Sequence, residues 1–209
     1  MEIELKYLLK DRAQADRIFS DEAVKQAEDE KSFETIDMHS VYYDTAAHDL
    51  TEAGIAVRVR KEGDLYVATM KDRGESAEGM HRREEINVRL SDDRMITSPE
   101  LSIFSESSEY ERILGITGGK KLVPVLEMKF ERRQVRLDTG GSISELSADD
   151  GRIIAGEKSL PLMELELELY SGSEQDMEDF GRDLAERYGL VPEDKSKFQR
   201  GYELATGRA

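Results

Sequence analysis

The 209-residue sequence has no cysteine, only 4 prolines and no long hydrophobic run. The missing cysteine excludes disulfides, thiolate metal sites and cysteine nucleophiles, and it is typical of a cytoplasmic protein. The longest apolar stretch, residues 122–126, contains a proline and is far too short to span a membrane. Basic residues are also few: the sequence has 30 Lys and Arg but 46 Asp and Glu, so the net charge is -16. This acid excess argues against binding to nucleic acids or anionic lipid.

The length favours one domain over residues 1–209. Alternation of apolar and polar residues predicts strands at residues 1–9, 33–43, 55–61, 65–71, 80–90, 125–138, 142–148, 152–155 and 162–170. Helices are expected at residues 13–30, 109–114 and 174–188, with Ser98 as an N-cap before Pro99 and a mobile loop at residues 72–79. We therefore expect an α+β domain with a mainly antiparallel sheet.

Several predicted strands carry like charges on one face. Glu164, Glu166 and Glu168 alternate with leucines, and Arg58 and Arg60 alternate with valines. Neighbouring residues on one face of a strand are about 6.6 Å apart at the backbone. One interpretation is a set of ordinary solvent faces. However, like charges in a row repel each other. The separation of acidic and basic residues onto different strands therefore indicates that each row has an oppositely charged partner across a cavity, or a bound ion.

A closed antiparallel barrel can turn such polar faces inward around a water-filled lumen. Rows of carboxylates there would suit a hard divalent cation, with Mg²⁺ or Mn²⁺ as the expected cofactor. Rows of arginine and lysine would suit a highly charged anion. The two together are what phosphoryl chemistry requires, because it needs charge neutralisation and an oriented nucleophile.

Short motifs along nearly the whole chain resemble those of the CYTH superfamily, the triphosphate tunnel metalloenzymes. They occur in the family's order: Glu2-Ile3-Glu4-Leu5-Lys6, Tyr42-Tyr43-Asp44-Thr45, Ile55-Ala56-Val57-Arg58-Val59-Arg60, Thr69-Met70-Lys71, Arg83-Glu84-Glu85, Phe130-Glu131-Arg132, Asp149-Asp150-Gly151, Glu164-Leu165-Glu166 and Lys195-Ser196-Lys197. The residues around Arg83, Glu166 and Arg200 are most similar to the bacterial inorganic triphosphatase branch. There a helical CHAD domain often follows; residues 1–209 contain none, which leaves a protein that stands alone or a shortened chain as alternatives.

The resemblance implies a closed eight-stranded antiparallel β-barrel with helices packed outside, and it implies roles for individual residues. The implied metal ligands are Glu2, Glu4, Glu85, Asp149, Glu164, Glu166 and Glu168. The implied phosphate-binding residues are Lys6, Arg58, Arg60, Lys71, Arg83, Arg132 and Lys197, and the catalytic group is Glu4, Lys6, Glu166 and Arg58. Two points stay open: whether the acidic pair is Glu164 with Glu166 or Glu166 with Glu168, and which of Arg132 and Arg133 faces inward.

The function implied is metal-dependent hydrolysis of inorganic triphosphate or a related triphosphate, in a protein whose relatives are often homodimers. Thiamine triphosphate is one such related substrate. A class IV adenylate cyclase, which converts ATP to cyclic AMP and pyrophosphate, is the main alternative on the same fold. A non-catalytic polyphosphate-binding module is a further alternative if the carboxylates hold no metal.

Overall fold

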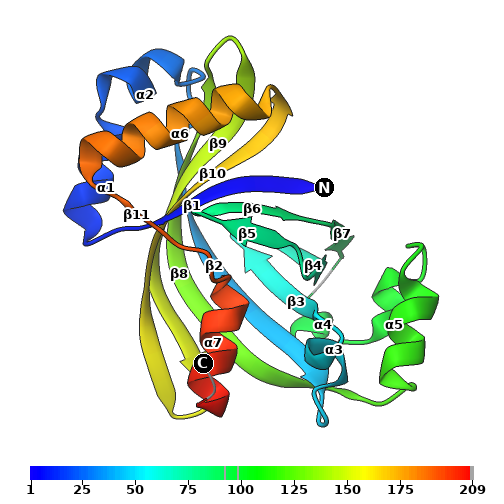
Figure 1. The fold of residues 1–209 in the computed structure, drawn as a ribbon. Coiled ribbons are helices and arrows are strands. Elements are labelled where there is room, and N and C mark those ends of the chain that lie inside the picture. The colour runs from blue at the N-terminus through cyan, green and yellow to red at the C-terminus, as the bar shows by residue number, and fades with distance from the viewer. Residues whose placement is uncertain (92, 98, 208–209) are drawn as a thin grey trace.

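A computed structural model describes residues 1–91, 93–97 and 99–207, and Figure 1 shows a strongly curled antiparallel sheet with helices around it. The strands are β1 (Glu2–Leu8), β2 (Glu34–Thr45), β3 (Ile55–Glu62), β4 (Leu65–Asp72), β5 (Glu75–Ala77), β6 (Met80–Arg83), β7 (Glu85–Leu90), β8 (Leu122–Asp138), β9 (Ser142–Ala155), β10 (Lys158–Gly172) and β11 (Val191–Pro192). The helices are α1 (Arg12–Phe19), α2 (Glu22–Ala27), α3 (Asp49–Glu52), α4 (Arg94–Thr97), α5 (Tyr110–Thr117), α6 (Glu174–Tyr188) and α7 (Lys197–Thr206), with a 3₁₀ turn at Leu101–Phe104. In this part of the chain, none of the helices combines the length and apolar character needed to cross a bilayer.

The strands form one sheet in the order β5-β6-β1-β10-β9-β8-β2-β3-β4-β7, and β11 pairs with Tyr7 and Leu8 of β1, beyond the residues that pair with β6. The expected α+β class and the antiparallel sheet are therefore confirmed. The series of paired strands ends at β5 on one side and at β7 on the other. The sheet between these two ends is curled (Figure 1).

Apolar side chains leave the curled sheet on its outer side and pack beneath the helices. Leu5, Leu165 and Leu167 are buried together with Met177 and Leu184 of α6. This contact is close because α6 has no side chain at Gly181, where a Cβ would lie 2.5 Å from a methyl group of Leu5. Because strand residues alternate between faces, burying these leucines outside turns the intervening charged residues inward.

Two further apolar clusters complete the packing. One lies between strands β3 and β4 and the segment that carries α3 and α5, around Val57, Leu50 and Ile113. The other lies where α7 covers β8, β9 and β10, around Met128, Ile153 and Phe198. Figure 1 shows α7 against one end of the curled sheet, with α6, α1 and α2 together at the other. The helix α7 therefore lies next to the concave face that holds the charged residues.

The structure corrects several expected elements. The helix predicted for residues 13–30 is two short helices, because Asp21 caps a second helix after the first ends at Ser20. Residues 72–79 contain strand β5. Residues 142–155 form one continuous strand instead of the two predicted at residues 142–148 and 152–155. Gly151 lies within it, where a Cβ would approach the Lys129 carbonyl oxygen to 2.1 Å. The proposed N-cap Ser98 lies outside the described residues.

Candidate active site

The concave face of the sheet encloses a cavity of about 860 Å³. The residues expected at the site line this cavity, with the exception of Asp149 and Glu164. Its walls are contributed by strands β1 to β10 and by the helices α3 and α7. Residues that are far apart in the sequence therefore converge on one space.

The pairing of β1 with β10 explains how the charges meet. Glu4 lies opposite Glu168, and Lys6 lies opposite Glu166, in an antiparallel register. Directly opposed residues on one face have Cβ atoms about 5 Å apart, so this register places two carboxylates side by side and one lysine beside a carboxylate. Glu4 and Lys6 are almost fully buried.

On the wall formed by β1, β4, β6 and β7, cations alternate with carboxylates. The Lys71 Nζ atom lies 2.6 Å from Glu2 and 2.5 Å from Glu85. The Arg83 guanidinium lies 2.7 Å from Glu4 and 3.2 Å from Glu2. Burial alone would raise the pKa of Glu85, but the charges of Lys71 and Arg58 outweigh it and lower that pKa to about 2. Glu85 is therefore ionised at neutral pH.

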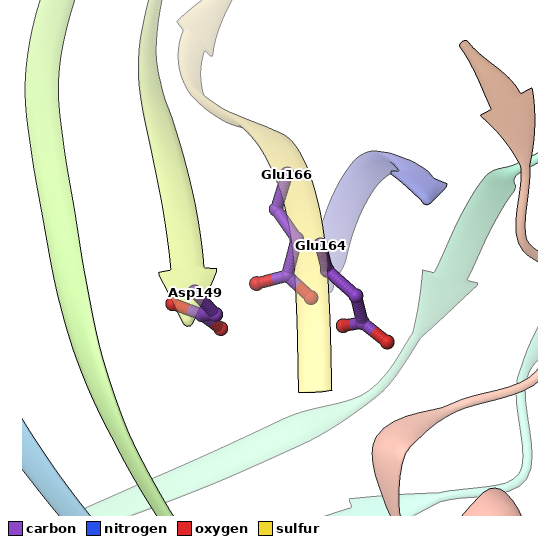
Figure 2. Close-up of side chains that lie close together, drawn as sticks. All are labelled: Asp149, Glu164 and Glu166. Carbon is purple, nitrogen blue, oxygen red and sulfur yellow. The ribbon is translucent and has the colours of Figure 1, made fainter. Parts of the chain in front are cut away.

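A second, deeper cluster consists of Asp149 on β9 with Glu164 and Glu166 on β10, shown in Figure 2. Their carboxylate oxygens come within 4.8 Å of one another. The Lys197 Nζ atom of α7 lies 3.0 Å from Asp149, 2.7 Å from Glu164 and 2.5 Å from Glu166. Burial opposes the charge on Lys197, yet these three carboxylates outweigh it and raise the pKa of the lysine. An internal cation thus already occupies the centre of this cluster.

Two arginines complete the deep cluster. Arg132 donates two hydrogen bonds to Asp149, at 2.7 and 2.8 Å, and one to Glu166 at 2.7 Å. Arg200, from α7, donates to Glu164. Such paired, charge-assisted hydrogen bonds satisfy buried carboxylates that would otherwise be costly. Arg200 was not among the predicted site residues; its only sequence signal was its place beside the motif that resembles the triphosphatase branch.

Glu168 differs from the other carboxylates. No ion pair or hydrogen bond of its side chain is found among the described residues, and it faces the charges of Glu2 and Glu4. Burial is the main reason that the pKa of Glu168 is raised to about 7, and the neighbouring Glu2 and Glu4 add to the effect. The carboxylates of β10 that line the open cavity are thus those of Glu166 and Glu168, while Glu164 lies deeper under α7.

The donor set formed by Glu2, Glu4 and Glu168 fits a hard divalent cation. It offers only carboxylate oxygens, which Mg²⁺ and Mn²⁺ prefer. No ion pair of Glu168 is found among the described residues, and a bound divalent ion would relieve the repulsion from Glu2 and Glu4 that adds to the effect of burial on its pKa. The Asp149, Glu164 and Glu166 cluster fits less well, because Lys197 already neutralises it.

The neighbouring arginines of β8 point to opposite faces. Arg132 lines the cavity. Arg133 lies outside, over the ring of Phe19 at 5.4 Å and paired with Asp16 of α1. Strand alternation leaves room for only one of them inside, and the apolar contact with α1 places Arg133 on the outer side.

Tyr42, Phe198 and Tyr202 also line the cavity, although they were not predicted as site residues. The Tyr42 and Phe198 ring centroids are 5.2 Å apart, and those of Phe198 and Tyr202 are 6.1 Å apart. The signal for Tyr42 was available, because it belongs to the matched motif at residues 42–45 and its strand pairs with the arginine strand. Its neighbour Tyr43 points outward, and its hydroxyl donates to the Ile96 carbonyl oxygen.

A curled antiparallel sheet around sorted acids and bases is the arrangement that the resemblance to the CYTH family implies. The comparison with family descriptions agrees: the CYTH domain matches residues 1–202, and the chain belongs to this family. The resemblance suggested by the motifs is therefore confirmed.

Known relatives share this fold to different degrees. An inorganic triphosphatase from Haemophilus influenzae is 31% identical over 167 residues, which are 80% of this chain and 46% of that protein. The chain thus spans less than half the length of this relative. A structure of an adenylyl cyclase candidate from Hippeastrum, described as revealing a dominant triphosphatase activity, has a TM-score of 0.70 at 21% identity and covers 100% of this chain and 97% of that one. A protein from Bacillus halodurans, provisionally named an adenylate cyclase, has a TM-score of 0.57 at 19% identity, with 96% of each chain covered.

Proposed function

We propose that this chain hydrolyses a triphosphate inside the cavity, with inorganic tripolyphosphate as the first substrate to test. The observation that carries the proposal is one cavity that holds a row of buried arginines and lysines beside carboxylates fit for a divalent cation. The Haemophilus relative is named for the same reaction, and the Hippeastrum structure is described as having triphosphatase activity.

We also propose that the sheet functions as the closed eight-stranded barrel expected of the family. Strands β4 and β5 form one bent arm of a hairpin, and β6 and β7 form the other, since β4 pairs with β7 and β5 pairs with β6. The Asp72 N–H donates to the Glu84 carbonyl oxygen at 3.1 Å where the two halves meet. Because β6 also pairs with β1, these two arms with β1, β10, β9, β8, β2 and β3 would form a ring of eight strands.

In this proposal the triphosphate replaces carboxylates as the partner of the cavity cations. The phosphate-binding set is Lys6, Arg58, Arg60, Lys71, Arg83, Arg132 and Lys197. Most of them now neutralise internal acids, so a bound polyanion would exchange one set of ion pairs for another rather than face an uncompensated positive cavity. Their fixed positions would orient the phosphate chain and stabilise charge that develops on its oxygens.

Glu2, Glu4, Glu166 and Glu168 would hold the divalent cation, Mg²⁺ or Mn²⁺, with Glu85 at the edge of the same group. Such an ion would supply charge neutralisation and Lewis acidity at the phosphates. The chain's own contribution is to hold these carboxylates on one wall of the cavity, with Arg83 and Lys71 between them. Asp149 and Glu164 would not contact the substrate; they would hold Lys197 and Arg132 in place through ion pairs.

One assay tests the proposal. The purified chain is incubated with Mg²⁺ or Mn²⁺ and with tripolyphosphate, thiamine triphosphate or ATP, and orthophosphate and cyclic AMP are measured. We expect orthophosphate from at least one triphosphate, and no release when EDTA is present. Cyclic AMP as the product would replace the proposal with a cyclase, and binding without turnover would replace it with a polyphosphate-binding module.

Three further expectations stand as proposals with this function. Residues 1–209 would act as a single CYTH domain, the protein would be cytoplasmic, and a homodimer would be its state of association. None of them enters the argument for the site.

A further inference from the structure

Arg58 is set apart from the other cations of the cavity. Its side chain is buried, yet no carboxylate of the described residues lies within the 4.0 Å that defines an ion pair. Lys6, Lys71, Arg83, Arg132 and Lys197 each have at least one such carboxylate, and Arg60 has Glu62 at 2.6 Å. The Arg58 Nε atom is buried without any hydrogen-bond partner. A buried guanidinium with an unpaired N–H is costly unless something else binds it.

The partner that Arg58 does have is the phenol of Tyr42. The two residues lie opposite each other in the pairing of β2 with β3. The guanidinium lies close enough to the phenol for its positive charge to act on the phenol oxygen. The ring of Tyr42 is held by the Phe198 ring of α7, at 5.2 Å between centroids and an angle of 32°. Tyr42 is only 5% exposed, so its ring is held by the surrounding packing.

The hydroxyl of Tyr42 keeps its donor function for a ligand, because no acceptor for its O–H proton is found among the described residues. Burial alone would raise the pKa of Tyr42, but the positive charges of Arg58, Lys71 and Arg60 lower it. A phenol polarised in this way is a good hydrogen-bond donor to an anion, and Tyr42 lines the cavity.

We propose that Tyr42 is a further substrate-contacting residue, which holds the Arg58 guanidinium in place and donates its own hydroxyl to the same phosphate group. This inference rests on the proposed function. The Tyr42–Arg58 pair can bind phosphate without breaking an internal ion pair, whereas the other cations must leave a carboxylate.

The test is a double-mutant cycle of Tyr42→Phe and Arg58→Lys. Tyr42→Phe removes one oxygen and keeps the ring packing against Phe198. Tyr43→Phe is the matched control, because it removes a hydroxyl from the next residue on the opposite face of the strand, where that hydroxyl bonds to Ile96. Tripolyphosphate binding is measured by calorimetry in EDTA, kcat and KM are measured with Mg²⁺ or Mn²⁺, and the melting temperature of each variant is recorded.

We expect Tyr42→Phe to weaken tripolyphosphate binding and to lower kcat/KM by about tenfold to 100-fold, which is the range for one hydrogen bond to a charged group. The losses from Tyr42→Phe and Arg58→Lys should not multiply, because each variant removes the same paired contact. Tyr43→Phe should keep both values and change only the melting temperature.

Three results would overturn the inference: wild-type binding and kinetics in Tyr42→Phe, losses that multiply in the double variant, or an equal loss in Tyr43→Phe. Failure of the proposed function gives a different result from failure of this inference. If the wild-type chain binds tripolyphosphate without hydrolysing it, the triphosphatase proposal is refuted, and the role of Tyr42 is still tested by binding. If the wild-type chain neither binds nor hydrolyses tripolyphosphate, both proposals are refuted.

Discussion

The Lys197 Nζ atom lies 2.7 Å from the Glu164 Oε2 atom, so an ion pair hidden from solvent joins the helix α7 to strand β10. Glu164 is fully buried, and its ion pairs among the described residues are with Lys197 and Arg200, both on α7. Strand β10 and this helix therefore depend on each other. Removal of either partner would leave a buried charge without compensation.

We predict that Lys197→Met lowers the free energy of unfolding by about 3 to 5 kcal/mol, the usual cost of breaking a buried ion pair. Methionine keeps the volume but leaves Asp149, Glu164 and Glu166 without their shared cation. The loss should be larger at pH 8 than at pH 5, because the carboxylates can take up protons at the lower pH. Chemical denaturation measures it.

Lys195→Met is the control for this prediction, since Lys195 is 45% exposed and pairs with Glu203 at the surface. It should cost less than about 1 kcal/mol. Equal stability of the two variants would mean that α7 is not anchored through Lys197.

Glu168 makes the stability of the metal-free protein depend on pH. Its pKa is raised from 4.5 to about 7 in the folded chain, so the fold favours the protonated form. This contribution is fully present below about pH 4.5 and is lost as the pH rises through 7. We expect Glu168→Gln to reduce the fall in unfolding free energy between pH 5 and pH 8 by up to about 3 kcal/mol.

Denaturation in EDTA at a series of pH values measures this difference. Glu186→Gln, at an exposed position on α6, should follow the wild type throughout. A pH profile of Glu168→Gln that overlays the wild type would show that Glu168 is not held among carboxylates.

Glu4→Gln should lower turnover of tripolyphosphate by at least about 100-fold while the protein stays folded, because the amide is a weaker ligand for a hard cation and cannot pair with Lys6 and Arg83. Phosphate release and circular dichroism measure the two effects. Glu84→Gln is the control: Glu84 has a side chain that is 73% exposed and precedes the cavity residue Glu85. Full activity in Glu4→Gln would refute its role as a metal ligand.

Leu5→Ala tests which face of β1 is the core. Leu5 is fully buried against α6, and truncation of such a leucine costs about 3 kcal/mol through lost burial and the cavity left behind. Leu65→Ala, at a position that is 43% exposed, should cost little. Thermal denaturation compares them, and a small effect of Leu5→Ala would place the apolar face of β1 elsewhere.

Much of the architecture follows from local pattern. Residues that alternate between glutamate and leucine can only form a strand with one charged and one apolar face, so Glu164, Glu166 and Glu168 were predictable as one row. The order of the motifs predicted the family, which the match over residues 1–202 confirms. The assignment of individual residues to metal or phosphate stays a prediction.

Contacts between distant segments decided the rest. Alternation says that Arg132 and Arg133 face opposite ways, but only the packing of Phe19 from α1 places Arg133 outside. Likewise, the three glutamates of β10 are equivalent in sequence, and α7 makes them different by pairing Lys197 with Glu164 while Glu168 stays without a cation. The side-chain period of a strand is a local property, whereas depth and ion pairing depend on which remote element covers each position, and that is a property of the whole fold.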